Sequence, residues 1–225
     1  MKFVVVFLIA VLAASGERMQ LTCGQIRHFV DGHNSRRQMV ARGLLAGQPA
    51  ASDMKFLVWD EELAEKAAKW AETIALIHNP NRTIPSKRWD IVGENIYLGK
   101  AYTPQGIAAK PKIEEVLNCW FEENTNYHFR PYTMEMYKIG HYTQMVWANT
   151  SRFGCGISQK RSDDNWTDVM YVCNYGPTGN IIDHLPYKKA YGGGRLLCHN
   201  KESCMKPYGK RCSANTSIKH TFKYF

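Results

Sequence analysis

The alternation of apolar and polar positions is clearest between Gly140 and Asn180, and it predicts a β-hairpin. The first arm mixes aromatic, β-branched and amide residues over 142–147. The second arm, 169–174, is rich in β-forming residues and stops at a turn sequence. Each arm carries one cysteine, Cys155 and Cys173. We therefore expect an antiparallel pair with a disulfide across adjacent strands.

Apolar residues at helical spacing predict three helices before this hairpin. The first covers 23–42 and ends at a glycine. The second begins after Asp60, a good N-cap, and is expected to stop at Asn79-Pro80 because proline disfavours helix in the residue before it. The third spans roughly 112–124, and a short strand is expected at 94–98. The apolar face of the second helix consists of Leu63, Ala67, Trp70, Ile74 and Ile77.

The first 16 residues have the pattern of a secretory signal peptide. One lysine precedes an apolar run from Phe3 to Ala14, and small residues follow at cleavage spacing. This run is too short to span a bilayer, and no later stretch is long enough, so we expect no transmembrane segment. The mature chain is then expected to start near Glu17, to be secreted and extracellular, and to be long enough for one well-buried domain.

Seven cysteines in a secreted chain favour disulfides over a zinc framework, because the sequence contains no C-x-x-C pair. Cys155–Cys173 is the expected bridge, and the odd number leaves one cysteine free or intermolecular. Two further bridges are left open among Cys23, Cys119, Cys198, Cys204 and Cys212. Four sequons mark candidate glycosylation sites, at Asn81, Asn149, Asn165 and Asn215.

The positive charge is concentrated at the C-terminus. The whole chain carries a formal net charge of +9. Residues 188–225 hold nine lysines and arginines against one acid, and the signal peptide holds one more lysine, so residues 17–187 are neutral overall. With three cysteines and the Gly192-Gly193-Gly194 run, residues 191–225 are expected to form a small crosslinked extension after a flexible joint.

Two functions are open for this basic extension. It is suited to binding sulfated glycans or anionic membrane surfaces. Alternatively, its charges only face water and keep the protein soluble. Nucleic acid is excluded as an expected partner because a secreted protein meets little of it.

Two segments resemble the signature sequences of a known family. GHYTQMVWANTSRFGCG and YVCNYGPTGN are similar to those of the cysteine-rich secretory protein, antigen 5 and pathogenesis-related (CAP) superfamily. GENIYLG and HNSRRQMVARG resemble its other recurrent segments, and WDEELAEKAAKWA is most like antigen 5-type allergens of arthropod venom and saliva. The resemblance implies an α+β fold, a three-layer α-β-α sandwich with a small antiparallel sheet, here over residues 17–190.

The same resemblance implies a central cleft with two histidines and two glutamates. The matching positions are His78, expected at the end of the second helix, and Glu94 of the GEN segment. Glu123, three residues after Trp120, and His141, which opens the first signature, complete the set. All four residues are present.

Three kinds of chemistry are open to such a set. Neutral imidazoles of His78 and His141 are suited to hold zinc or another divalent cation, which we expect not to be essential. A glutamate and a histidine also suit base and acid catalysis, and a hydrogen-bonded polar cluster is the third reading. We assign no catalytic residue, because no activated serine or cysteine and no HExxH helix is present. The alternative is a metal-dependent hydrolase or peptidase with Glu94 or Glu123 as base.

Several other residues have both a structural and a functional reading. Tyr142 and Gln144 are expected to line the cleft beside His141 or to face the sheet. His33 is expected to be a structural residue of the first helix. The aromatic segment 127–137 either borders a groove for a lipid or other small hydrophobic ligand, or packs internally.

The crosslinks depart from the family pattern. Ile77 and Val92 stand where many relatives carry cysteines near the cleft, which leaves Cys23 without an obvious family partner. The extension is also too poor in cysteine for the channel-blocking module of vertebrate members. We therefore expect a monomeric, antigen 5-like binding protein of the venom or salivary type that sequesters a small ligand or engages a host target.

Overall fold

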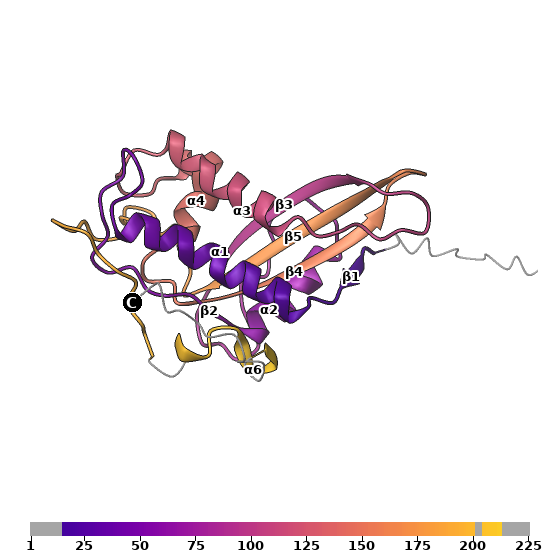
Figure 1. Cartoon of the computed structure of the whole chain (residues 1–225), viewed down its shortest axis with the longest axis horizontal. Helices are drawn as coiled ribbons and strands as arrows, with labels where there is room; N and C mark the ends of the chain where they lie inside the picture. The colour runs from indigo at the N-terminus through magenta and orange to yellow at the C-terminus, as the bar shows by residue number, and fades with distance from the viewer. Residues whose placement is uncertain (1–14, 201–203, 213–225) are drawn as a thin grey trace, which may run out of the picture.

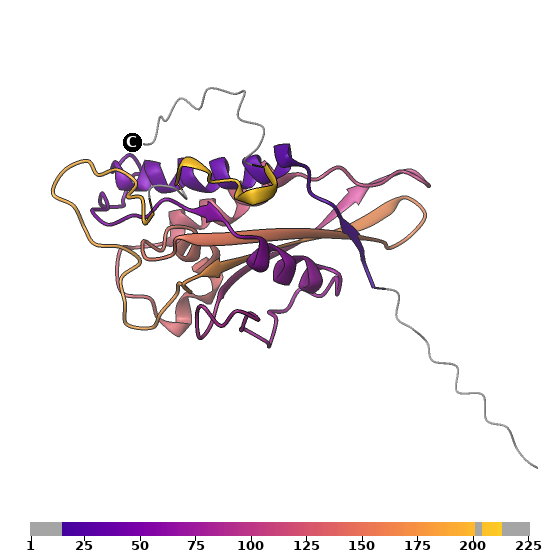
Figure 2. The same ribbon diagram turned by 90° about the horizontal axis from the view of Figure 1, so that it is seen from below.

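The computed structural model describes residues 15–200 and 204–212. The strands are β1 (Glu17–Met19), β2 (Val58–Trp59), β3 (Gly93–Tyr102), β4 (Arg152–Arg161) and β5 (Trp166–Gly176). The α-helices are α1 (Cys23–Ala41), α2 (Glu61–Ala71), α3 (Ile113–Glu122), α4 (Gly140–Met145) and α6 (Gly209–Cys212). Two 3₁₀ helices, η1 (Glu123–Asn126) and η2 (Met134–Ile139), flank the loop before α4. The expected three-layer α-β-α architecture is confirmed, with α1 and α2 on opposite faces of the sheet (Figures 1 and 2).

The sheet is built on the order β1-β4-β5-β3, and β2 adds a short parallel pairing to β4. Its three long strands are antiparallel, and their side chains alternate between two cores. In β5, Val169, Tyr171 and Cys173 belong to the large core that contains α1 and α3. Met170 and Val172 belong to a smaller core under α2. Because successive side chains of β5 point to opposite faces of the sheet, its apolar residues pack alternately against the helical layers on the two faces.

Two glycines of β4 let α2 lie directly on the sheet. A Cβ on Gly154 would lie 2.2 Å from the Ala64 backbone nitrogen, and one on Gly156 would lie 2.2 Å from the Ala68 Cα. Only glycine leaves room for backbone at this distance. The close packing of α2 on the sheet thus depends on the missing side chains of Gly154 and Gly156 as well as on the apolar face of the helix.

The first helix forms as its sequence predicts. Thr22 and Gln25 close a capping box at its start, and Gly43 follows its end with a φ of +70°. Arg37 on this helix is fully buried, and its guanidinium donates only to backbone carbonyl groups. These carbonyls belong to the segments around Lys55 and after α4, so Arg37 holds both segments to α1.

The second helix is shorter than predicted. Asp60 caps it as expected, by accepting from two backbone N–H groups, but the helix ends at Ala71 rather than near Asn79. Ile74 has a φ of +50°, and Ile77 is 62% exposed. Ile74 lies outside the helix but still packs against the smaller core, whereas Ile77 does not belong to the apolar face as predicted. The segment after Ala71 continues the apolar spacing without continuing the helix. His78 therefore lies in a loop.

The first arm of the predicted hairpin is helical over most of its length. Residues 140–145 form α4, and the strand that pairs with β5 is Arg152–Arg161. The β-forming residues of 142–147 are overridden by burial, because Tyr142 and Met145 are fully enclosed in the large core. The hairpin itself and its disulfide are confirmed: Cys155 and Cys173 are opposite each other and bonded.

The other cysteine pairings close the C-terminal segment onto the body. Cys212 is bonded to Cys23 at the start of α1, and Cys198 is bonded to Cys204. Cys119 is the free cysteine, and it is exposed. With three disulfides the chain fits an extracellular, oxidising compartment.

The end of the expected joint is hydrogen-bonded to the body, and the flexibility of the joint stays a prediction. The backbone of Gly194 donates to Ala41 at 2.7 Å, and the backbone of Leu197 donates to Met54 at 2.7 Å. Leu196 and Tyr208 are buried in the same core as α1. The described part of the basic extension is therefore packed onto the body rather than appended to it. The division into residues 17–190 and 191–225 stays a prediction.

Some predictions fall outside the described residues. These are most of the signal peptide, at residues 1–14, and the sequon at Asn215. Within the described ranges, none of the helices has both the length and the apolar character that a membrane crossing requires.

Candidate functional site

Glu94 is the most enclosed member of the predicted cleft set. Its side chain is fully buried, and it accepts three hydrogen bonds. The donors are His78 Nδ1 at 2.9 Å, the Asn79 backbone at 2.9 Å and Asn174 Nδ2 at 3.1 Å. Asn174 is directly opposite Glu94 in the β3–β5 register. A carboxylate with this many donors is fixed in position and holds His78 by one ring nitrogen.

Glu123 and His141 form a second pair of the same kind. Glu123 Oε1 lies 2.6 Å from His141 Nδ1, and its other oxygen accepts from the Tyr142 backbone at 3.0 Å. The His141 ring also stacks on Trp120, with ring centroids 5.8 Å apart. One face of the imidazole and one nitrogen are thus held by the protein.

Strand β3 links the two pairs. Glu94 holds His78, and the next residue, Asn95, donates to the backbone carbonyl of His141 at 3.1 Å. Successive residues of a strand point to opposite faces, so the His78 and His141 pairs are attached on the two sides of β3, which is an edge strand of the sheet. The structure therefore brings all four predicted residues to the Gly93 end of β3.

Two supporting residues were missed at the sequence level. Asn174 orients Glu94, and Asn95 joins His141 to the buried hydroxyl of Tyr175 at 3.3 Å. The signal for Asn174 was available, because a correct hairpin register places it beside the GEN segment. Asn95 is part of the GEN segment, but the sequence gives no signal for its role.

Tyr142 and Gln144 lie beneath the cleft rather than on its surface. Tyr142 is fully buried against Phe121, and burial raises the pKa of its phenol. Gln144 is 2% exposed, and its carbonyl oxygen accepts from the Gly179 backbone at 2.9 Å. Neither residue faces the sheet in a strand, because both are on α4. They hold the helix that carries His141.

The aromatic segment is divided between core and surface. Tyr127 and Met136 are almost fully buried, whereas Met134 and Tyr137 are about 70% exposed. The exposed pair lies on η2, which leads directly into α4 and His141. Packing thus accounts for part of this segment, and an apolar border remains beside the second histidine.

The accessible parts of the two histidines define what the cleft offers to a partner. The side chains of His78 and His141 are 53% and 30% exposed. Because a carboxylate accepts at each Nδ1, each Nδ1 carries a proton, and in the neutral imidazole Nε2 is the nitrogen with the lone pair. Among the described residues, no cluster of three or more His, Cys, Asp or Glu side chains is arranged to hold a metal ion.

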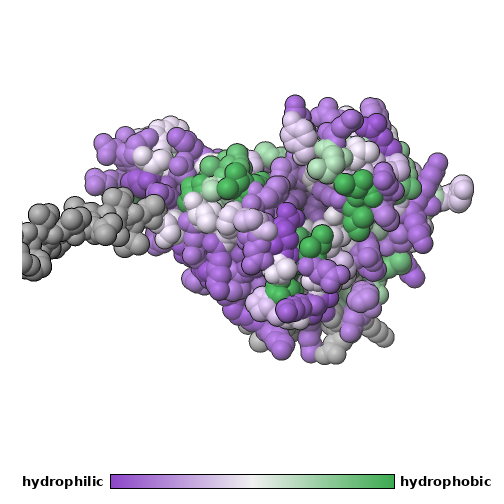
Figure 3. Space-filling model, turned by 180° about the vertical axis from the view of Figure 1, so that it is seen from behind, coloured by the Kyte–Doolittle hydropathy of each residue, from purple (hydrophilic) through white to green (hydrophobic). Residues whose placement is uncertain are grey.

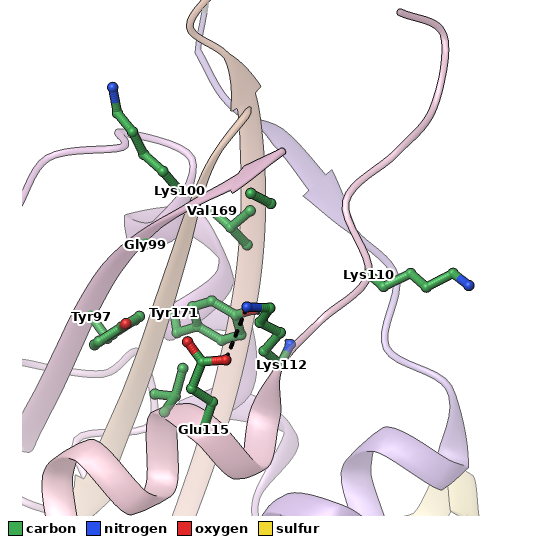
Figure 4. Close-up of a pocket in the computed structure, with 10 residues that line it drawn as sticks. Tyr97, Gly99, Lys100, Lys110, Lys112, Glu115, Val169 and Tyr171 are labelled. Carbon is green, nitrogen blue, oxygen red and sulfur yellow. Dashed lines mark hydrogen bonds and ion pairs between the residues drawn. The ribbon is translucent and has the colours of Figure 1, made fainter. Parts of the chain in front are cut away.

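A small pocket elsewhere does not compete with this cleft. It lies between β3, β5 and the start of α3, with a volume of about 40 Å³. Figure 4 shows Lys100 and Lys110 directed away from it, and Lys112 paired with Glu115 at 3.0 Å. Its volume is about that of one water molecule, and the pocket does not gather positive charge.

The surface carries separate apolar patches on a largely hydrophilic face (Figure 3). Exposed aliphatic residues adjoin the cleft in sequence on both sides, Leu76 and Ile77 before His78, and Ile181 and Ile182 after Asn180. Asn180 is hydrogen-bonded to the Gly140 carbonyl at 2.8 Å, next to His141.

The described sequons are all accessible. Asn81, Asn149 and Asn165 are exposed, so each is open to carry a glycan, and their glycosylation stays a prediction. His33, by contrast, is buried and bonded at both ring nitrogens, which confirms its structural role.

Comparison with known proteins agrees with this geometry. The model of the cysteine-rich secretory protein family, CAP, matches residues 30–175. GLIPR1-like protein 1 of Mus musculus is 34% identical over 199 residues, which cover 85% of this chain and 76% of that protein. Venom allergen 5 of Polistes fuscatus is 39% identical over 169 residues, which cover 72% of this chain and 78% of that protein.

A solved structure described as NaASP2 with Zn2+ superimposes with a TM-score of 0.58 at 30% identity, and covers 73% of this chain and 85% of that one. The fold, the signature segments and these relatives lead to one assignment. The chain belongs to the cysteine-rich secretory protein (CAP) family and resembles its venom antigen 5 members.

Proposed function

We propose that this protein is a secreted binding protein whose His78/His141 cleft holds a divalent metal ion and, with it, a small ligand or a host target. The observation that carries this proposal is the pairing of each imidazole with a glutamate through Nδ1. A carboxylate behind a histidine fixes the tautomer and raises the basicity of the opposite nitrogen, as in many zinc sites.

The residues present fit an open metal site rather than a closed one. His78 and His141 supply two nitrogen ligands, and the glutamates are engaged behind them. A bound divalent cation would act as a Lewis acid with coordination positions left for water or a ligand group. The zinc named for the NaASP2 structure supports this choice of metal, at 30% identity.

The class of ligand follows from the border of the cleft. Polar groups lie at its centre, and exposed apolar side chains of Ile77, Met134 and Tyr137 lie on the segments beside the histidines. A small amphipathic or hydrophobic molecule, such as a lipid with a metal-binding head group, matches both features.

Binding is favoured over hydrolysis by the state of the two glutamates. Glu94 accepts three hydrogen bonds and Glu123 accepts two, so neither carboxylate has the freedom expected of a general base. No nucleophile with an adjacent base is present at the described cleft. The metal-dependent hydrolase remains the alternative that experiment has to exclude.

Retention on anionic surfaces is a second proposed property. It is supported by six exposed lysines and arginines in the described part of residues 188–212. Because this segment is packed onto α1, its charges belong to a fixed surface, which reduces the entropy lost when an anionic polymer binds.

Calorimetry with zinc tests the cleft. Wild type is titrated beside His78→Gln/His141→Gln, with His128→Gln/His184→Gln as a matched pair of exposed histidines. Binding is expected to vanish only in the first variant; equal isotherms for wild type and that variant would remove the cleft as the metal site. A hydrolase panel with and without zinc is run on the same proteins, and metal-dependent cleavage lost in the cleft variant would establish the alternative.

A further inference from the structure

A second groove lies where the C-terminal segment meets the body, apart from the histidine cleft. Its volume is about 350 Å³, and its lining includes Lys55, Arg152, His199 and Trp89. A smaller hollow shares Arg152 and His199 and extends it toward Cys204. The groove thus falls in the size range of small-molecule sites.

The C-terminal side of the groove is held firmly in place. Leu197 pairs with the body through two backbone hydrogen bonds, one from Phe56 at 2.8 Å and one to Met54 at 2.7 Å. His199 and Asn200 follow immediately, inside the loop that the Cys198–Cys204 disulfide closes. The opposite side of the groove belongs to the body. It is formed by Lys55, by Arg152 at the start of β4 and by Ser151, which precedes that strand.

The described lining of the groove is positively charged. Its described lining residues include a lysine, an arginine and a histidine and no carboxylate. The Lys55 ammonium contacts the Asn149 side-chain oxygen and backbone carbonyl rather than an anion. Burial, followed by the nearby charge of Arg37, lowers the pKa of Lys55, and the nearby carboxylate of Asp53 acts in the opposite direction. An anionic group would therefore be stabilised here.

The remaining lining has the character of a saccharide site. Trp89 is partly exposed, and its ring lies on the backbone of Gly176, where an added Cβ would come within 2.4 Å of a ring carbon. Pro177, the next residue after Gly176, also lines the groove. The Arg88 guanidinium already lies over this ring, 4.7 Å from its centroid, so only the exposed part of the Trp89 ring is open to a ligand. That part, with nearby polar groups such as Ser151 and Asn200, suits contact with a sugar ring that carries charged substituents.

We propose that this groove binds a sulfated glycan chain, with Lys55 and Arg152 on a sulfate group and Trp89 against a sugar ring. The proposal rests on the surface retention proposed above and gives it a location and a chemical class. Charge-assisted hydrogen bonds from two fixed cations would contribute most of the affinity, and exposed lysines elsewhere would add only screened attraction.

The test compares two double variants with the same loss of charge. Lys55→Gln/Arg152→Gln removes the groove cations, and Lys100→Gln/Lys110→Gln removes two exposed lysines at the far end of the sheet. Full-length secreted protein is titrated with a heparin oligosaccharide at neutral pH, and folding is checked by circular dichroism. The groove variant is expected to bind about ten-fold more weakly, and the control to change by less than about two-fold. Lys55→Gln alone, which leaves Arg152 in place, is expected to give an intermediate loss.

Four results would overturn the proposal. Equal losses in the two double variants would show a dependence on net charge alone. Unchanged binding in the groove variant, with wild type retained on heparin, would reject the groove but leave surface retention standing. No retention of wild type would reject both. Chemically desulfated heparin and inorganic sulfate serve as additional probes: weak binding of each is expected, and full binding of the desulfated chain would reject sulfate recognition.

Discussion

The imidazole of His33 and the phenol of Tyr175 are joined by a hydrogen bond of 2.9 Å in the interior of the protein. The other ring nitrogen of His33 donates to the Phe29 carbonyl at 2.8 Å, so Nε2 must accept from the tyrosine hydroxyl. Asn95 also donates to that hydroxyl at 3.3 Å and to the His141 carbonyl at 3.1 Å. A buried chain of hydrogen bonds thus connects α1 to the histidine cleft.

This arrangement predicts a loss of stability in acid that belongs to His33. Burial lowers the pKa of His33 from 6.5 to about 3. The unfolded chain therefore binds one more proton than the folded chain between these values, so the stability is fully present above pH 6.5 and is lost as the pH falls toward 3. The expected slope is about 1.4 kcal/mol per pH unit.

Urea unfolding of wild type and His33→Gln across this range measures that slope. The variant loses stability at neutral pH. Its free energy of unfolding is expected to change less steeply with pH, because one proton fewer is taken up on unfolding. Parallel curves for the two proteins would show that His33 does not titrate on unfolding.

The glutamates behind the cleft histidines are expected to set metal affinity without touching the metal. Replacing Glu94 or Glu123 by Gln keeps the shape but removes the charge that acts on each imidazole. Zinc affinity is expected to fall by about 10- to 100-fold for each variant. Calorimetry measures this, with Glu122→Gln as an exposed neighbouring control; an effect of the control as large as that of Glu123→Gln would contradict the pairing mechanism.

The Cys23–Cys212 bridge is expected to stabilise the protein strongly. It joins residues separated by 189 positions and ties the basic segment to α1. Its removal by Cys23→Ser/Cys212→Ser is expected to lower the free energy of unfolding by about 2–5 kcal/mol. Denaturant unfolding checks this value against Cys119→Ser, which removes an exposed free thiol and is expected to change stability by less than about 0.5 kcal/mol.

A methyl group on Gly156 is expected to separate α2 from the sheet. Its Cβ would lie 2.2 Å from the Ala68 backbone, which cannot move without the helix. Gly156→Ala is therefore expected to cost about 1–3 kcal/mol or more. Gly192→Ala, where no atom lies within 4 Å of the new Cβ, is the control with little effect. Thermal unfolding that ranks the two variants equally would refute the close contact.

Local pattern explains why much of the fold was predicted correctly. The apolar spacing of the first helix, the N-cap at Asp60 and the facing cysteines of the hairpin all act over short distances in the chain. Such signals depend on neighbouring residues, so a single sequence contains them. The signature segments added the four cleft residues by resemblance.

The failures share a different cause. Helix α2 ends at Ala71 although apolar spacing continues, and residues 142–145 are helical although they are rich in β-forming side chains. In both places contacts with distant segments decide the backbone: Gly16 donates to the Glu72 carbonyl at 2.7 Å, and Tyr142 is enclosed by the large core. Propensities of a fraction of a kcal/mol per residue do not prevail against such burial.

By itself, the sequence determined the first helix, the start of the second helix and the Cys155–Cys173 pair, and its resemblance to the family indicated the four cleft residues. Only the tertiary structure decided that Asn174 and Asn95 orient them, that Cys23 pairs with Cys212, and that the described part of the basic segment packs against the body. The physical reason is that these contacts join residues far apart in the chain. Their partners become definite only when the sheet register and the packing of α1 bring them together.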